Sequence, residues 1–262
     1  MDEKKYVANT PFVSWNEKQR IQALKSSLEL LLDFGEKYVE LFDLEKEQKN
    51  NTLNKGFVYF DQSYRHIVEL TRYVVFVEGR GKKFTHYMVR AALEGSMRLE
   101  HYVKQNKEEQ DKISSIEIAR AVKISQSDDQ DGHSFAEWMQ NLELSPEEYT
   151  PQRSKKFFDP FPDMRTLVDS SFIKKVTSLD WYVHYEYLCE LTHGKLVGII
   201  SLEQEGNTII FYRRNLMYLH SILKHTLLLV DKHINFVTQD ELKHVIQLSD
   251  RKAFYGENDL EG

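Results

Sequence analysis

The sequence predicts a mostly α-helical bundle, with one small β-hairpin near residues 196–212 and a polar insertion near residues 105–160. Two observations favour this fold class. Apolar residues recur at helical spacing over several long segments, and only 5 prolines and 11 glycines occur in 262 residues. A β-sandwich or barrel needs many turns, which draw on those residue types. We therefore expect a single helical domain over residues 1–262 that includes the insertion.

In the N-terminal part, Ser14 is predicted to cap a helix that runs to about residue 48, since Glu17 completes a capping-box pattern. Two further helices are expected at about 57–77 and 84–104. The glycines of the GRGK turn at 79–82 separate them, so they should pack as an antiparallel pair.

The segment 105–160 is polar and contains most of the prolines. Short helices are expected at about 109–125 and 133–142. Because the segment lacks a long apolar pattern, we interpret it as an insertion lying on the bundle rather than as a second domain.

The C-terminal part returns to helical spacing. Helices are predicted over 163–176 and 180–193, the second capped by Asp180. Two β-branched runs flank 205–207 and indicate the hairpin. The last helix is expected from about 215 to 237, with residues 240–248 either continuing it or forming a separate helix. Its apolar stripe consists of Leu216, Leu219, Leu223, Leu227 and Val230.

Composition limits the location and the partners of the chain. The net charge of −6 disfavours broad non-specific binding to a phosphate backbone. The apolar runs of the chain are too short to span a bilayer, so no membrane partner is expected. A single cysteine, Cys189, fits a reducing compartment, and the charged N-terminus does not look like a signal peptide. We therefore expect a cytoplasmic protein.

One candidate polar pair is Arg90 and Glu94, which lie four residues apart and so share a helix face. Their neighbours are small or apolar, which indicates a buried face. A buried arginine needs a carboxylate, so removing Glu94 should strand Arg90 and lower stability sharply. A structural ion pair and a functional pair are both open readings.

A second candidate face lies in the segment HYEYLCELTHG, residues 184–194. Tyr185, Cys189 and His193 recur every four residues and line one side of a helix. A histidine in this place serves as a general base, a metal ligand or a structural group. An isolated cysteine is more often inert than nucleophilic.

Together these two segments resemble a domain of unknown function found in mostly bacterial helical proteins. Its pattern is an Arg-x3-Glu helix followed by a helix of the form Tyr-x2-Leu-Ser-x3-His. Here Arg90 and Glu94 match the first part, and Tyr185 and His193 the second, while Cys189 replaces the usual serine. The resemblance implies an interior Arg/Glu/Tyr/His cluster that is structural or binds a small polar or nucleotide-like ligand. It implies no reaction.

The segment RRNLMYLH, residues 213–220, is similar to the Arg-x4–6-His motif of HEPN ribonucleases, with Arg214, Asn215 and His220 at the matching positions. This resemblance implies a dimeric, metal-independent endoribonuclease, or an inactive relative, of a toxin or phage-defence system. The histidine would move a proton and the arginine would stabilise the transition state. On a regular helix the two lie about 240° apart, so a bulge or Arg213 as the partner would be required.

The remaining site classes are weaker. Glu190-x2-His193 and Glu241-x2-His244 resemble half of a di-iron site, but Glu241 lies in a polar segment outside the expected core. The common zinc-binding and nucleotide-loop motifs are absent. We expect no metal and no cofactor. Whether the protein is an enzyme stays open, as do three partner classes: a second copy of the chain, RNA, and a protein that docks on the acidic surface.

Overall fold

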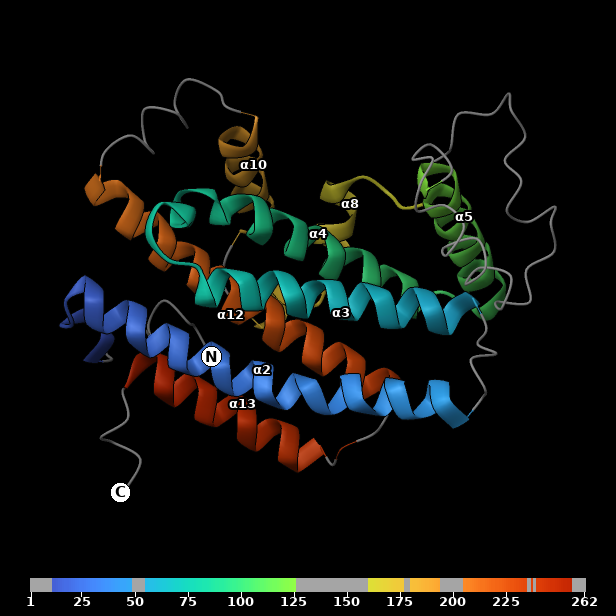
Figure 1. Cartoon of the computed structure of the whole chain (residues 1–262), viewed down its shortest axis with the longest axis horizontal. Helices are drawn as coiled ribbons and strands as arrows, with labels where there is room; N and C mark the ends of the chain where they lie inside the picture. Colours follow the sequence, from blue (N-terminus) through green and yellow to red (C-terminus); the bar gives the residue numbers. More distant parts are fainter. Residues whose placement is uncertain are drawn as a thin grey trace.

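The computed structural model describes residues 11–48, 55–125, 160–176, 180–193, 205–234, 237 and 239–255. Within these residues the chain is mostly helical and has no strand, which confirms the all-α class (Figure 1). The bundle is built from four long helices: α2 (Glu17–Gln48), α3 (Lys55–Phe76), α4 (Thr85–Lys104) and α12 (Glu205–Ile234). The 3-10 turn η2 (Gly79–Phe84) joins α3 to α4 as the expected antiparallel pair.

Helix α12 is the centre of the bundle, because it packs against α2, α3 and α4. Its predicted apolar stripe is confirmed, since all five residues are fully buried: Leu216, Leu219, Leu223, Leu227 and Val230. The segment after it is a separate helix, α13 (Gln239–Phe254), which packs mainly on α2. The short 3-10 helix η1 (Pro11–Val13) touches α13.

The predicted β-hairpin is wrong where the structure describes it, because residues 205–212 form the first turns of α12. Residues 196–204 lie outside the described part. The β-branched run at 208–210 has strand propensity, but tertiary packing overrides it. Tyr212 is 1% exposed and its hydroxyl donates to the carbonyl oxygen of Val74 at 2.9 Å. Tyr212, Leu216 and Leu219 therefore extend one helical stripe onto α3 and the rest of the core.

The start of α2 also differs from the prediction. The capping box is formed by Asn16 and Gln19, not by Ser14 and Glu17. The amide N–H of Gln19 donates to Asn16 Oδ1 at 3.0 Å, and the amide N–H of Asn16 donates to Gln19 Oε1 at 2.9 Å. The Ser14 hydroxyl instead donates to the carbonyl oxygen of Pro11. Both pairs fit the sequence rule, and the geometry selects the second.

Shorter helices cover the α4 side of the bundle. Helix α5 (Lys107–Ser125) begins the predicted insertion and packs on α3, whereas residues 126–159 lie outside the described part. The helix expected over 163–176 is divided into α8 (Met164–Ser170) and α9 (Ile173–Val176). Helix α10 (Trp181–Thr192) packs on α4 and α8, and Asp180 caps it as predicted by accepting from the Val183 amide.

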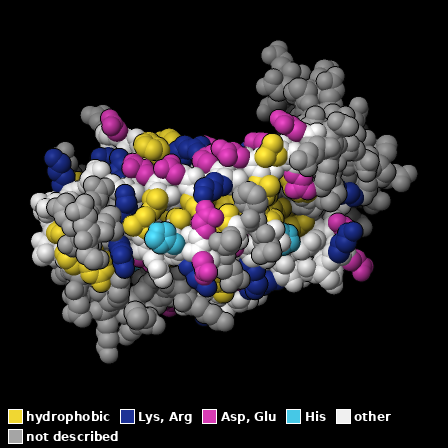
Figure 2. Space-filling model, turned by 90° about the horizontal axis from the view of Figure 1, so that it is seen from below, with side chains coloured by type: hydrophobic (Ala, Val, Ile, Leu, Met, Phe, Trp, Pro, Cys, Tyr) yellow, Lys and Arg dark blue, Asp and Glu magenta, His cyan; other side chains and the backbone are white. Residues whose placement is uncertain are grey.

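The surface of the bundle carries charges of both signs. On the face shown in Figure 2, basic and acidic side chains are interspersed among the coloured residues. That face therefore does not display an extended basic track of the kind that follows a nucleic-acid backbone. None of the helices in the described ranges is long and apolar enough to cross a membrane.

Candidate functional site

Arg90 and Glu94 on α4 meet Tyr185 on α10. Arg90 Nε donates to Glu94 Oε1 at 2.9 Å, and the Tyr185 hydroxyl donates to the same oxygen at 3.0 Å. The guanidinium carbon of Arg90 lies 5.7 Å from the centroid of the Tyr185 ring, within cation–π range. The side chain of Cys189, one turn further along α10, hydrogen-bonds to Tyr185. We call these four residues the α4–α10 cluster.

The α4–α10 cluster lies at the surface, which corrects the expectation of an interior site. The side chains of Arg90 and Glu94 are 22% and 27% exposed. The buried stripe of α4 runs through Val89 and Leu93, one position before each member of the pair. A shift of one residue turns a side chain by about 100° around the helix, so the pair faces the edge of α10 rather than the core.

Tyr185 is held in its neutral form, which suits hydrogen bonding. Burial raises the pKa of the Tyr185 phenol, and the adjacent Cys189 and the Glu94 carboxylate raise it further. The phenol therefore keeps its proton at neutral pH and donates it to Glu94. Cys189 is a free, half-buried thiol.

His193 does not join the cluster. It follows the last residue of α10, and its side chain is exposed. Its main-chain N–H donates to the carbonyl oxygen of Cys189 at 2.9 Å and closes the helix. The spacing of four residues places His193 on the same face as Tyr185 and Cys189, but the helix ends there and the exposed side chain has no contact with the other three residues of the expected Arg/Glu/Tyr/His cluster.

The pair keeps unused hydrogen-bonding groups. Within the described residues, Arg90 bonds only through Nε, and Glu94 accepts only through Oε1. Both terminal nitrogens of the guanidinium and the second carboxylate oxygen remain available to a ligand. A partly exposed arginine with two free N–H edges is suited to a carboxylate or phosphate, which it can bind in a bidentate manner.

The structure does not bring together the three residues of the ribonuclease-like motif, Arg214, Asn215 and His220. Arg214 is exposed and lies over the rings of Tyr187 and Phe211. Asn215 is buried and donates to Thr85 Oγ1 at 2.8 Å. His220 is 2% exposed on the opposite side of α12.

The surroundings of His220 are structural. Its Nε2 lies 2.7 Å from Ser249 Oγ, and Ser249 in turn hydrogen-bonds to Ser27. Burial holds the pKa of His220 well below its ordinary value, and the charge of Lys224 acts in the same direction. A serine beside a histidine is an arrangement found in nucleophilic catalysis, but Ser249 and Ser27 are both fully buried. A substrate has no access to this pair. The other proposed partner, Arg213, is bound by Glu17 at 2.9 Å.

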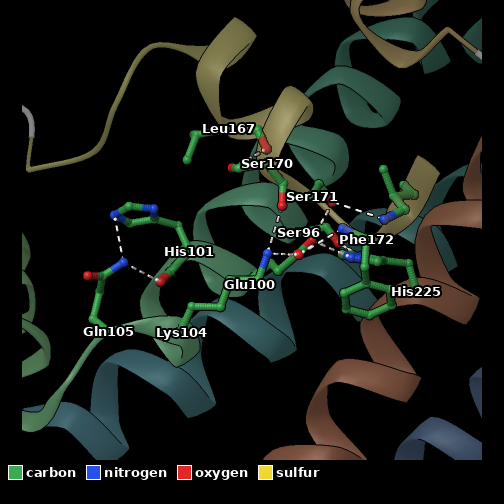
Figure 3. Close-up of polar contacts among 11 residues, drawn as sticks. Ser96, Glu100, His101, Lys104, Gln105, Leu167, Ser170, Ser171, Phe172 and His225 are labelled. Carbon is green, nitrogen blue, oxygen red and sulfur yellow. Dashed lines mark hydrogen bonds and ion pairs between the residues drawn. The ribbon is translucent and has the colours of Figure 1, made fainter. Parts of the chain in front are cut away.

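A buried ionic network on α4 was not predicted from the sequence. Glu100 Oε2 lies 2.7 Å from His225 Nε2, and Glu100 Oε1 accepts the main-chain N–H of Phe172 at 2.9 Å (Figure 3). Ser171 and Lys104 also contact the Glu100 carboxylate. The network explains why the helix predicted over 163–176 breaks, because Glu100 binds the Ser171 hydroxyl and the Phe172 amide at that point.

No group of three or more His, Cys, Asp or Glu side chains could hold a metal ion in the described part of the chain. Glu241, considered above for a di-iron site, is exposed and pairs with Lys37 at 2.7 Å.

Comparisons of the chain with protein-family models, with curated proteins and with solved structures find no match. The two family resemblances drawn from short motifs therefore stay predictions, and a function has to be inferred from the site geometry.

Proposed function

We propose that the protein binds a small polar ligand at the α4–α10 cluster, through a carboxylate or phosphate group of that ligand. The observation that carries the proposal is the sharing of one Glu94 oxygen by Arg90 and Tyr185 at a partly exposed position. At such a position the remaining hydrogen-bonding groups of the pair are open to water, which a ligand can displace.

The unused groups define the ligand. The two terminal nitrogens of Arg90 match the two oxygens of a carboxylate or phosphate. The second oxygen of Glu94 accepts a hydroxyl, amine or amide from the same molecule. The Tyr185 ring, which lies within cation–π range of the guanidinium, offers an apolar surface. The ligand therefore carries an anionic group and a hydrogen-bond donor a few ångströms apart.

Calorimetric titration of the full chain with inorganic phosphate, glutamate and adenosine monophosphate (AMP) tests this proposal. The variants are Arg90→Gln and Glu94→Gln. The matched control is Arg72→Gln, which removes an arginine from another partly exposed pair, with Glu36 and Glu69 on α2 and α3. A hydrogen bond to a charged group contributes about 1.5–3 kcal/mol, so loss of Arg90 should weaken binding roughly 10- to 100-fold.

The proposal is supported if at least one probe binds the wild type and the control but binds Arg90→Gln much more weakly. It is contradicted if none of the three anions binds at millimolar concentration, or if all variants bind equally.

The ribonuclease alternative ranks lower on geometry, because Arg214 and His220 have separate partners and His220 is buried. It predicts metal-independent RNA cleavage that is lost in Arg214→Ala and His220→Ala. Cleavage that survives both changes would remove that assignment. The acidic interaction module stays a prediction that pull-down experiments can test.

A further inference from the structure

A second cluster lies on the other side of α10 from Tyr185, where α10 meets α12. His184 and Tyr187 are three residues apart on α10, and Phe211 and Arg214 are three residues apart on α12, so each pair shares a helix face. The Tyr187 and Phe211 rings are stacked, with centroids 6.1 Å apart and an interplanar angle of 24°. The α4–α10 cluster uses neither ring.

Arg214 lies over this aromatic stack. Its guanidinium carbon is 5.6 Å from the centroid of Tyr187 and 5.9 Å from that of Phe211. The cation–π contact uses one flat face of the guanidinium, and Arg214 also hydrogen-bonds to the Tyr187 side chain. A guanidinium has five N–H groups, so the others remain available for an anion.

Arg214 has no carboxylate partner in the described part of the chain. Several arginines of the described residues are bound to carboxylates, namely Arg65, Arg72, Arg90 and Arg213. Arg214 has no such carboxylate within the described ranges, and the same is true of the exposed Arg165 and Arg251.

His184 adds a second polar group beside Arg214. Its Nδ1 lies 2.8 Å from the Tyr218 hydroxyl, which fixes the ring. Burial lowers the pKa of His184, and the nearby positive charge of Arg214 lowers it further, so the imidazole is neutral at pH 7. Its Nε2 has no hydrogen-bond partner in the described part of the chain and can bond a ligand oxygen.

We propose that Arg214, His184, Tyr187 and Phe211 form a binding site for a mononucleotide. The phosphate contacts the guanidinium and the imidazole, and the base stacks against the aromatic and guanidinium faces, a geometry that proteins use widely for unpaired bases. A free nucleotide fits better than a nucleic-acid strand. Arg213, the next residue to Arg214, is engaged by Glu17, so this cluster offers a single guanidinium rather than a basic track.

The test is calorimetric titration of the full chain with AMP, adenosine, inorganic phosphate and a five-nucleotide oligoadenylate. AMP should bind more tightly than adenosine or phosphate alone. Arg214→Gln should weaken AMP binding about tenfold or more, as expected for loss of a charge-assisted hydrogen bond. Tyr187→Leu should weaken AMP binding but leave phosphate binding unchanged. Arg251→Gln, an exposed arginine on α13 with the same change of charge, is the control.

The proposal is overturned if AMP does not bind at millimolar concentration, or if wild type and Arg214→Gln bind AMP equally. It is also overturned if the oligoadenylate binds more tightly per nucleotide than AMP, because the ligand would then be a nucleic-acid strand. The same titrations distinguish failure of this proposal from failure of ligand binding at the α4–α10 cluster. Loss of AMP binding in Arg90→Gln alone would assign the nucleotide to the α4–α10 cluster and remove it from this one.

Discussion

Replacing Glu100 with alanine should destabilise the protein far more than the same change at Glu94, although both residues lie on α4. Glu100 is 1% exposed and is bound by His225, Ser171, Lys104 and the Phe172 amide. Burial lowers the pKa of His225, so at neutral pH Glu100 accepts a hydrogen bond from a neutral imidazole. Removing Glu100 leaves the imidazole, the Ser171 hydroxyl and the Phe172 amide without their acceptor. Each buried donor left unsatisfied costs about 1–3 kcal/mol, so a total loss of about 3–5 kcal/mol is expected. At about 2–4 °C per kcal/mol for a chain of this size, Tm should fall by roughly 6–20 °C.

Glu94→Ala is the matched control, since it removes the same charge from the same helix. The Glu94 side chain is 27% exposed and its partner Arg90 is 22% exposed, so water can replace the lost contact. A pair of this kind contributes about 0–1 kcal/mol. The expected loss of stability on removing Glu94 is therefore small, whereas the sequence analysis predicted a sharp loss because it placed Arg90 and Glu94 on a buried face. Urea denaturation of both variants measures the difference, and equal free energies of unfolding would refute the role assigned to the Glu100 network.

The same residue predicts a pH dependence. Burial raises the pKa of Glu100, but hydrogen bonding and charge from His225, together with Lys104 and Ser171, outweigh it and lower the pKa from 4.5 to about 2. A carboxyl group with a lowered pKa stabilises the folded state above its unfolded pKa and loses that contribution as pH falls toward the folded pKa. The stability difference between wild type and Glu100→Gln should therefore narrow between about pH 4.5 and 2, by roughly 3 kcal/mol in total. A constant difference over that range would contradict the assignment.

Two further predictions concern the helices. An alanine Cβ at Gly35 would lie 2.9 Å from the Tyr64 hydroxyl, which donates to the Gly35 carbonyl, so Gly35→Ala should lower stability despite a gain of about 1 kcal/mol in helix propensity. In a Tyr64→Phe background, Gly35→Ala should become neutral or stabilising. A double-mutant cycle measured by thermal denaturation tests this, and an absence of coupling between residues 35 and 64 would contradict the role of this contact. Ile210→Pro should cost about 3 kcal/mol because residue 210 lies inside α12, whereas Ile210→Ala, at a 39% exposed position, should cost little. Equal effects of the two substitutions would contradict a helix at residue 210.

Local patterns predicted most of the architecture because helix formation and burial are encoded at short range. The α12 stripe and the Asp180 cap depend on residues three or four positions apart, and both were found as expected. The hairpin failed for the opposite reason. The strand propensity at 208–210 is local, whereas the contact of Tyr212 with α3 joins residues 138 apart.

The site was predictable only in part for the same physical reason. The spacing of Arg90 and Glu94 predicted that the two side chains contact each other. It did not predict how far the pair is exposed, because small neighbouring residues are compatible with a buried or a half-buried helix face. The Glu100 network joins α4 to Ser171, 71 residues away, and no local spacing signals such a bond. The local sign was a histidine, His225, in the largely apolar segment 222–230 of α12.

The single cysteine provides the most direct test of ligand binding at the α4–α10 cluster. Cys189 is half-buried and bonded to Tyr185, so a ligand on Arg90 and Glu94 should slow its alkylation by iodoacetamide. The measurement is the alkylation rate with and without phosphate, glutamate or AMP, in wild type, Arg90→Gln and Arg72→Gln. We predict protection by at least one anion in wild type and Arg72→Gln, and its loss in Arg90→Gln. An unchanged rate with every anion, or equal protection in Arg90→Gln, would contradict a binding site at this cluster.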